Sequence, residues 1–299
     1  CDAAFRPALT NSLANGNLRG SLLMVAAMFG FALEDMFLKS AAKTMPVGLI
    51  LIIFGAGGML AFTALTLLRG ERVFHPAILT RPIAIRAAFE VLGRLFYTLA
   101  IAFNPLSSAS AILQATPLMV VAGAALIFGE SVGWKRWAAI IVGFVGVLII
   151  LRPGLEGFTP ASVLAVLGMI GFAGRDLATR AAPPVLSNLQ LGIYGFAMMA
   201  PTGAGLLAFS GGAHLPTPTT SLQLLAATLV GVAAYYALTA AMRMGEVSVI
   251  TPFRYTRLVF ALILGVTVFH EAPDAMTLLG SAIIVGSGIY TLTRSKRRA

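Results

Sequence analysis

Long apolar segments alternate with very short polar connections along almost the whole chain. Ten segments can be counted, with bounds at 19–38, 46–68, 83–103, 107–128, 135–151, 160–179, 187–209, 221–242, 247–269 and 275–293. Each is close to the about 20 residues that an α-helix needs to cross the hydrocarbon core of a bilayer. The connections leave no stretch for a soluble domain. The pattern therefore predicts an all-α polytopic membrane protein with ten transmembrane helices.

The fourth segment, 107–128, contains no charged residue, and its polar side chains follow one face. Ser107, Ser110 and Gln114 are spaced i, i+3 and i+7, which places them on a single stripe of a helix. Pro117 removes a backbone hydrogen-bond donor near the middle of the segment. We therefore expect this helix to present hydrogen-bonding groups at membrane depth.

The same pattern returns 141 residues later, in Val247–Glu271. The matching residues are Ser248, Thr251, Tyr255 and Glu271 for Ser107, Ser110, Gln114 and Glu130. The two glutamates are predicted to be helix-terminal anchors. The first and sixth segments match at the same offset, beginning with Leu23 and Leu164. The chain therefore contains an internal repeat.

Each half of the chain holds five segments, an odd number, so the second half must insert upside down relative to the first. We expect a disordered cytoplasmic tail over 1–18, the first repeat over 19–152, the second over 153–293 and a basic cytoplasmic tail over 294–299. Inverted repeats with a binding site near the membrane midplane are a transporter architecture. Exchanging the conformations of the two halves would convert an inward-open state into an outward-open one.

The composition agrees with a membrane protein and sets its orientation. The chain is 58% hydrophobic and 11% charged, whereas a soluble domain is about 25% charged. With the N-terminus in the cytoplasm, thirteen lysines and arginines outside the spans face inward, and only Lys39, Lys43 and Arg152 face outward. The positive-inside rule then predicts cytoplasmic termini in a bacterial-type inner membrane. Anionic lipid explains the net charge of +10 without a nucleic-acid partner.

Several kinds of chemistry have no motif in this sequence. A glycine-rich phosphate loop ending in Gly-Lys-Ser/Thr is absent, so ATP is not expected to drive the protein directly. Neither a metal-ligand spacing of His, Asp and Glu nor a serine nucleophile with a partner histidine is present. The single cysteine, Cys1, excludes an intrachain disulfide. We therefore predict no catalytic residue, no metal, no cofactor and no enzyme activity.

Ionisable and aromatic residues far from both membrane faces are the candidates for substrate binding, because charge at that depth is costly and usually functional. An arginine would hold a ligand carboxylate, Gln114 or Glu90 an ammonium group, and the tyrosines an apolar side chain. Glu90 and Arg94 are also spaced as a self-neutralising i, i+4 pair, which is the structural alternative. The predicted substrate-binding residues are Glu90, Arg94, Tyr97, Ser110, Gln114, Tyr235, Tyr236, Tyr255 and Arg257.

Three further charged residues are predicted to act in gating or coupling. Asp35 and Asp176 occupy the same position in the two repeats, so they would lie near opposite membrane faces; helix-end acids are the alternative. Arg254 lies close enough to the cytoplasmic end of its span to reach water with its long side chain instead. Arg257 is a turn deeper, and we expect it to face the cavity or to pair with Glu90, Asp35 or Asp176.

The repeat units also carry a resemblance to a known family. The pieces that match are Tyr97–Ala102, Ser107–Glu130 and Ala139–Ile149, repeated as Tyr236–Ala241, Val247–Glu271 and Ala282–Thr291. They resemble the EamA domain of the drug/metabolite transporter superfamily, and most of all its bacterial exporters of amino acids, including aromatic ones. His270 departs from the family pattern, which has glycine before the glutamate. The resemblance implies a basket in which spans 1–4 and 6–9 line a cavity, while spans 5 and 10 pack outside as a homodimer surface.

Three hypotheses follow. The leading one is a secondary transporter that exports small metabolites, above all amino acids, by alternating access through a membrane whose lipids surround it. The second is uptake or exchange of a larger nucleotide-like or cationic metabolite, which the intramembrane arginines disfavour. The third, a membrane receptor or enzyme, lacks both a signalling domain and a cluster of ionisable residues at one membrane face.

Overall fold

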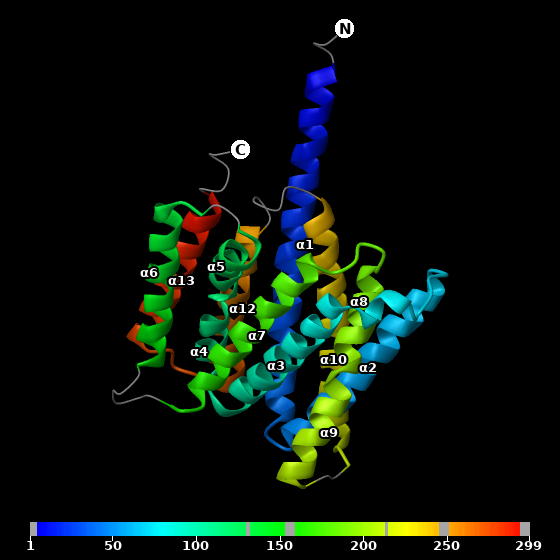
Figure 1. Ribbon diagram of the computed structural model, residues 1–299. Coiled ribbons are helices and arrows are strands. Elements are labelled where there is room, and N and C mark those ends of the chain that lie inside the picture. The colour runs from blue at the N-terminus through cyan, green and yellow to red at the C-terminus, as the bar shows by residue number, and fades with distance from the viewer. Residues whose placement is uncertain (1–4, 130–131, 153–158, 213–214, 245–250, 294–299) are drawn as a thin grey trace.

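The structure is a computed structural model, and it describes residues 5–129, 132–152, 159–212, 215–244 and 251–293. All the regular secondary structure in these residues is helical (Figure 1). The helices are α1 (Phe5–Ala41), α2 (Val47–Leu68), the 3-10 helix η1 (Pro76–Leu79), α3 (Arg81–Phe103), α4 (Leu106–Leu113), α5 (Thr116–Phe128), α6 (Trp134–Leu151), α7 (Ser162–Arg180), α8 (Asn188–Ala197), α9 (Met199–Ser210), α10 (Pro218–Met244), the 3-10 helix η2 (Thr251–Tyr255), α12 (Thr256–Phe269) and α13 (Ala275–Thr293).

Six stretches of the described residues are long and apolar enough to cross a membrane. They are Leu18–Ala41, Val47–Leu68, Leu106–Ile127, Ser162–Thr179, Asn188–Ser210 and Pro218–Leu238. Trp137–Leu151 and Ala275–Tyr290 are apolar but shorter. The 23-residue helix α3 carries Arg86, Glu90 and Arg94 in its inner turns, and α12 has only 14 residues. The structure thus supports a polytopic membrane protein, while the count of ten spans stays a prediction.

The first helix begins before the first predicted span. We expected disorder over 1–18, but α1 begins at Phe5 and continues without a break to Ala41. Pro7 falls in the first turn of this helix, where a proline is tolerated because its missing N–H would have no intrahelical partner. Extending an existing helix adds one hydrogen bond per residue fixed, whereas starting a new one is costly.

The polar fourth segment is broken into α4 and α5 close to Gln114. Pro117 cannot donate a backbone hydrogen bond to the carbonyl of Leu113, and the hydroxyl of Thr116 donates to that oxygen instead, at 2.5 Å. The break leaves Gln114 and Ala115 between the two helices, where Gln114 is buried. The expected weakening of the backbone by Pro117 is therefore present, and it occurs beside the central polar residue of the stripe.

Helices of one repeat pack on helices of the other across the interface between the repeats. α1 packs most extensively on α10 and α3 on α7, and these two pairs are equivalent because α7 repeats α1 and α10 repeats α3. Equivalent helices run in opposite directions along the bundle, as α1 and α7 show in Figure 1. The start of α1 and the end of α13 lie at the same end of the bundle, which is called the terminal end below (Figure 1). The opposite end is called the distal end.

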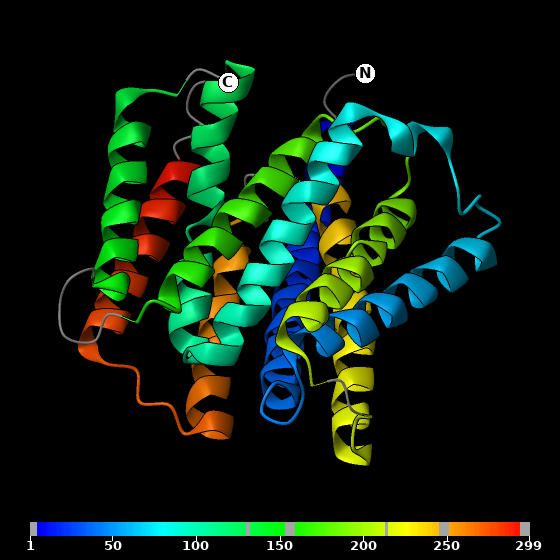
Figure 2. The same ribbon diagram turned by 60° about the horizontal axis from the view of Figure 1, so that its bottom comes forward.

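Two pairs of helices close the sides of the bundle. α6 packs on α13, and α2 packs on α8 and α9. Figures 1 and 2 place the first pair at one edge and the second group at the other. Close backbone contact explains some of the glycines: a Cβ at Gly171 of α7 would collide with the backbone of Gly93 in α3, and one at Gly280 of α13 would lie 2.6 Å from the carbonyl oxygen of Gly146 in α6. Small residues at helix crossings are typical of membrane bundles.

Candidate substrate site

A cavity lies between the two repeats, on the side of the bundle nearer the terminal end. Its volume is about 840 Å³, including the part open to solvent. The first residues of α3, α8 and η2 lie toward the terminal end (Figure 1), and Arg86, Leu191 and Arg254 of these helices line the cavity. Among the described residues, α2, α6 and α13 contribute no lining side chain. The outer position of α6 and α13 agrees with the expectation for spans 5 and 10, whereas span 2 was expected to line the cavity.

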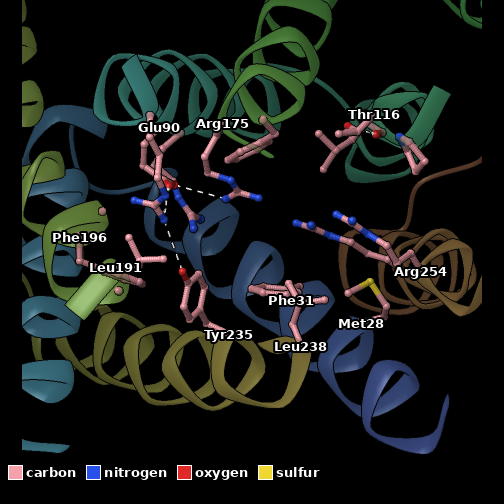
Figure 3. A pocket seen from close by; sticks show the side chains of 18 of the residues that line it. Met28, Phe31, Glu90, Thr116, Arg175, Leu191, Phe196, Tyr235, Leu238 and Arg254 are labelled. Atoms are coloured by element: carbon pink, nitrogen blue, oxygen red, sulfur yellow. Dashed lines mark hydrogen bonds and ion pairs between the residues drawn. The ribbon is translucent and has the colours of Figure 1, made fainter. Parts of the chain in front are cut away.

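Five arginines and one carboxylate line the cavity within the described part of the chain. The arginines come from three places around it: Arg86 and Arg94 from α3, Arg175 from α7, and Arg254 and Arg257 from η2 and the start of α12. Figure 3 shows Arg254 on the side of the cavity opposite Glu90 and Arg175. The guanidinium groups of both repeats therefore converge on one space.

One chain of ion pairs connects three of these arginines through two acids. Glu90 lies 3.6 Å from Arg86 Nη2 and 3.4 Å from Arg175 Nη1. Asp176 lies 2.8 Å from Arg175 Nη2 and 3.5 Å from Arg254 Nη2. Arg86 also donates to Thr179 of α7 at 3.0 Å. The predicted gate residues Asp176 and Arg254 are thus in contact, and Arg254 lines the cavity.

A second set of ion pairs lies deeper, toward the distal end. Arg94 pairs with Glu34 of α1 and not with Glu90, whose i, i+4 partner on α3 is Arg86. Arg257 donates to Asp35 Oδ2 from Nη2 at 2.6 Å and from Nε at 3.2 Å. Asp35 was one of the three acids expected for Arg257. Glu34 and Asp35 have no exposed surface, so both acids depend on their arginine partners.

Tyr97 and Ser110 belong to this deeper layer and do not line the cavity. The Tyr97 hydroxyl lies 3.2 Å from Asp35 and 3.1 Å from the Ser110 hydroxyl. Each of the two residues is only 1% exposed. A role in holding Asp35 therefore fits their positions better than direct contact with a ligand.

Gln114 and Tyr235, two of the predicted substrate-binding residues, line the cavity. Gln114 Nε2 donates to the backbone carbonyl of Arg254 at 3.1 Å, which joins the break between α4 and α5 to η2. The hydroxyl of Tyr235 accepts from Arg86 at 3.4 Å, across the cavity wall formed by α3 and α10 (Figure 3). These two side chains present an amide and a phenol next to the guanidinium groups.

The other two predicted tyrosines lie outside the cavity. Tyr236 is 44% exposed on the outer face of α10, where its hydroxyl accepts from Arg69 at 2.5 Å. Tyr255 is buried between η2 and α13, with its hydroxyl against Gly288. Tyr236 differs from Tyr235 by one helical position, which turns its side chain away from the site. Neither residue is among those that line the cavity.

Several lining residues were not among the predicted site residues. Arg86 and Arg175 carry charge at membrane depth, so the rule that selected Glu90 and Arg94 could also have selected them. The aromatic rings of Phe31, Phe172 and Phe196 form apolar parts of the wall. No sequence signal distinguishes these rings from core phenylalanines. Arg175 lies over the Phe172 ring at 4.9 Å from its centroid, so the aromatic wall also contacts the charges.

A separate polar cluster joins the helices at the distal end. Glu271 accepts hydrogen bonds from the backbone amide of Leu106 at 2.6 Å and from the amide of Ser107 at 3.0 Å. Lys39 at the end of α1 lies 3.4 Å from the same carboxylate. Glu271 is thus a helix-terminal anchor that acts on the first turn of α4. Its predicted counterpart Glu130 lies outside the described residues.

The comparisons with known proteins agree with this architecture. The profile of the EamA-like transporter family matches residues 18–152 and 159–293. The riboflavin transporter of Rhizobium johnstonii is 30% identical over 214 residues, which are 71% of this chain and 70% of that protein. The S-adenosylmethionine uptake transporter of Rickettsia bellii is 26% identical over 71% of this chain and 72% of its own length.

Two further comparisons span nearly the whole chain. The pseudopaline exporter CntI of Pseudomonas aeruginosa is 28% identical over 284 residues, 93% of this chain and 97% of that protein. A solved crystal structure is 21% identical, with a TM-score of 0.60 over 90% of this chain and 98% of its own, and it shows the same fold. The family profile covers both repeats in turn. The chain is therefore a member of the EamA-like transporter family.

Proposed function

We propose that this protein is a secondary transporter that exports small carboxylate-bearing metabolites. Amino acids, including aromatic ones, are among these metabolites. The observation that carries the proposal is the convergence of arginines from both repeats on one cavity at the repeat interface. A guanidinium group holds a carboxylate with two parallel hydrogen bonds. Glu90 and Gln114 offer acceptors for an ammonium group, and the phenylalanine rings offer an apolar wall. No metal, cofactor or catalytic residue has a part in this proposal.

Alternating access would use the pseudosymmetry of the two repeats. We place the ten spans in a bacterial-type inner membrane with both termini in the cytoplasm. The terminal end of the bundle would then face the cytoplasm, and the cavity would be open toward it. The layer of Asp35, Arg257 and Tyr97 would then close the cavity toward the outside. In the opposite state this layer would separate, and the layer of Arg175, Asp176 and Arg254 would close. Asp35, Asp176 and Arg254 are therefore proposed as gate residues.

The topology can be tested by itself. Lys43 follows the end of α1 and Lys135 lies in the first turn of α6, and these two helix ends lie at opposite ends of the bundle (Figure 1). We expect a membrane-impermeant thiol reagent to label single cysteines at the two positions from opposite sides. Cys1 would first be replaced by serine. Labelling of both positions from the same side would contradict the inverted insertion of the repeats.

Transport is tested with purified protein in liposomes. We expect efflux of labelled phenylalanine and other amino acids above that of protein-free vesicles, measured with and without a pH gradient. Flux that depends on the gradient would indicate proton coupling, and flux that ignores it would indicate facilitated diffusion. Absence of amino-acid flux from vesicles that hold folded protein would contradict the proposal.

Uptake of a larger nucleotide-like metabolite is the second candidate. Relatives named as riboflavin and S-adenosylmethionine transporters favour it. Flux of labelled riboflavin or S-adenosylmethionine in the same vesicles, without amino-acid flux, would select this alternative.

A homodimer through α6 and α13 is a further proposal, supported by the exposed apolar residues Ile141, Leu148 and Leu279 on that edge. Crosslinking between cysteines at Leu148 in two copies would test it.

A further inference from the structure

We propose that the cavity selects ligands with a net negative charge, so that organic anions bind in preference to zwitterions and cations. The inference rests on the proposed function, because it names which carboxylate-bearing molecules the same site takes. It follows from the numbers and positions of the charges around the cavity.

The first step is the charge balance of the site. The chain Arg86–Glu90–Arg175–Asp176–Arg254 contains three cations and two acids. The two deeper pairs, Arg94 with Glu34 and Arg257 with Asp35, are balanced. Among the described residues, the cavity and its ion-pair partners therefore carry one positive charge in excess.

The sign of this excess does not depend on which acids are ionised. A guanidinium group stays protonated in proteins. Protonation of any of the four acids would remove a negative charge and increase the excess. Within the part of the chain that the structure describes, the site therefore keeps its positive excess whichever of these acids are ionised, and a charge away from bulk water is stabilised best by an opposite charge.

The second step is the location of the uncompensated charge. Asp176 lies closer to Arg175, at 2.8 Å, than to Arg254, at 3.5 Å. The Arg254 side chain is 24% exposed, so its guanidinium group reaches the open part of the cavity. Figure 3 shows it pointing into the space between η2 and the helices that carry Glu90 and Arg175. A ligand anion beside Arg254 would therefore meet a guanidinium group that shares its one acid, Asp176, with Arg175.

The third step is the poor fit of a second, positive group. Glu90 is the carboxylate among the described lining residues, and it is already shared by Arg86 and Arg175. A ligand ammonium group would have to compete with two guanidinium groups for that acid. An uncharged or aromatic part of the ligand would instead contact the rings of Phe31 and Phe172. The residues that line the cavity therefore distinguish ligands by their charge more than by their shape.

The test uses three probes with the same phenyl ring and different charge: N-acetylphenylalanine (one negative charge), phenylalanine (zwitterion) and phenethylamine (one positive charge). Dissociation constants are measured by calorimetry on the purified full-length protein in detergent at neutral pH. We expect N-acetylphenylalanine to bind about tenfold more tightly than phenylalanine, because both have the carboxylate but only phenylalanine has an ammonium group that the excess positive charge repels. Phenethylamine should bind most weakly.

Two substitutions of opposite charge then separate charge selection from a structural effect. Arg254→Gln removes the excess charge and should bring the ratio for the first two probes to within about threefold. Asp176→Asn adds to the excess and should widen the ratio. Arg69→Gln is the matched control, because Arg69 contacts Tyr236 on the outer face, and it should leave the ratio unchanged. A merely structural role of Arg254 would weaken all three probes alike.

The outcomes distinguish this inference from the proposed function. Equal binding of N-acetylphenylalanine and phenylalanine, or tightest binding of phenethylamine, overturns the charge selection while leaving a transport site in place. A ratio that does not change in either charge variant also overturns it. Failure of folded wild-type protein to bind any of the three probes contradicts the carboxylate site itself, and the proposed function with it.

Discussion

Glu271 Oε2 accepts hydrogen bonds from both the hydroxyl of Ser107, at 2.8 Å, and its backbone amide, at 3.0 Å. The two residues belong to different repeats: Glu271 follows α12, and Ser107 lies in the first turn of α4. The first backbone amides of a helix have no partner within it, and a carboxylate at this end also meets the positive end of the helix dipole. Glu271 therefore fixes the end of one repeat on the start of a helix in the other.

We expect Glu271→Ala to lower the free energy of unfolding by about 2 kcal/mol, because it removes several hydrogen bonds to a charged group. Unfolding of the purified protein in mixed micelles measures the effect. Asp274→Asn is the control. Arg152 donates a hydrogen bond to Asp274 and holds the pKa of that carboxyl below its usual range, but the pair is partly exposed. Such pairs contribute about 0–1 kcal/mol, so an equal loss in both variants would contradict the anchoring role of Glu271.

The polar stripe of the fourth segment shows what helical periodicity can and cannot predict. Its three residues share a face, but each has a different partner: Ser107 contacts Glu271, Ser110 contacts Tyr97, and Gln114 contacts the backbone of Arg254. Periodicity assigns a face to a helix and does not say which neighbouring helix meets it, or at what depth a cavity ends. The repeat and the all-helical fold were therefore predictable, and the division of the stripe into cavity, deeper layer and distal cluster was not.

The ion pairs give the same lesson for charged residues. Spacing along one helix suggested a pair between Glu90 and Arg94. In the structure Arg94 pairs with Glu34, and Glu90 pairs with Arg86 on its own helix and with Arg175 on α7. The sequence shows that buried charges need partners, but the choice between partners on the same helix and on another depends on how the helices cross. The same limit explains why the sequence did not show that Tyr235 lines the cavity and that Tyr236 faces outward.

The neighbours Tyr235 and Tyr236 provide a matched test of the cavity. Tyr235→Ala should raise the KM for transport several-fold or more, because it removes a ring and a hydroxyl from the wall beside Arg86. Tyr236→Ala should leave transport within about twofold of wild type, since that ring faces outward. Initial rates over a range of substrate concentrations, at equal amounts of protein per vesicle, give both values. A larger effect from Tyr236 would move the ligand path to the outer face of α10.

The ends of α5 and α12 test the cost of a left-handed backbone. Gly129 ends α5 with φ 67°, and His270 ends α12 at the equivalent position with φ 55°. A Cβ at Gly129 would meet no atom within 4 Å, so only the backbone conformation opposes a side chain there. We expect Gly129→Ala to lower the free energy of unfolding by about 1 kcal/mol.

Gly205 is the control for this substitution. A Cβ there also meets no atom within 4 Å, but the residue lies inside α9 with a helical backbone. Gly205→Ala should therefore stabilise the protein by up to about 1 kcal/mol. Effects of the same sign at the two positions would contradict the assignment of strain to the end of α5.

The pair of Asp35 and Arg257 makes an asymmetric prediction. Asp35 has no exposed surface, whereas Arg257 lines the cavity and can reach its water. Arg257→Gln would leave a buried carboxylate without its cation, and breaking a buried pair in this way costs about 3–5 kcal/mol. Asp35→Asn should cost less, because the freed guanidinium group can turn toward the cavity. The double variant Asp35→Asn with Arg257→Gln removes both charges and should be more stable than Arg257→Gln alone. Yield and unfolding of the four proteins in detergent complete a double-mutant cycle. Additive losses, with no recovery in the double variant, would show that the two residues act independently and that the deeper layer is closed by other contacts.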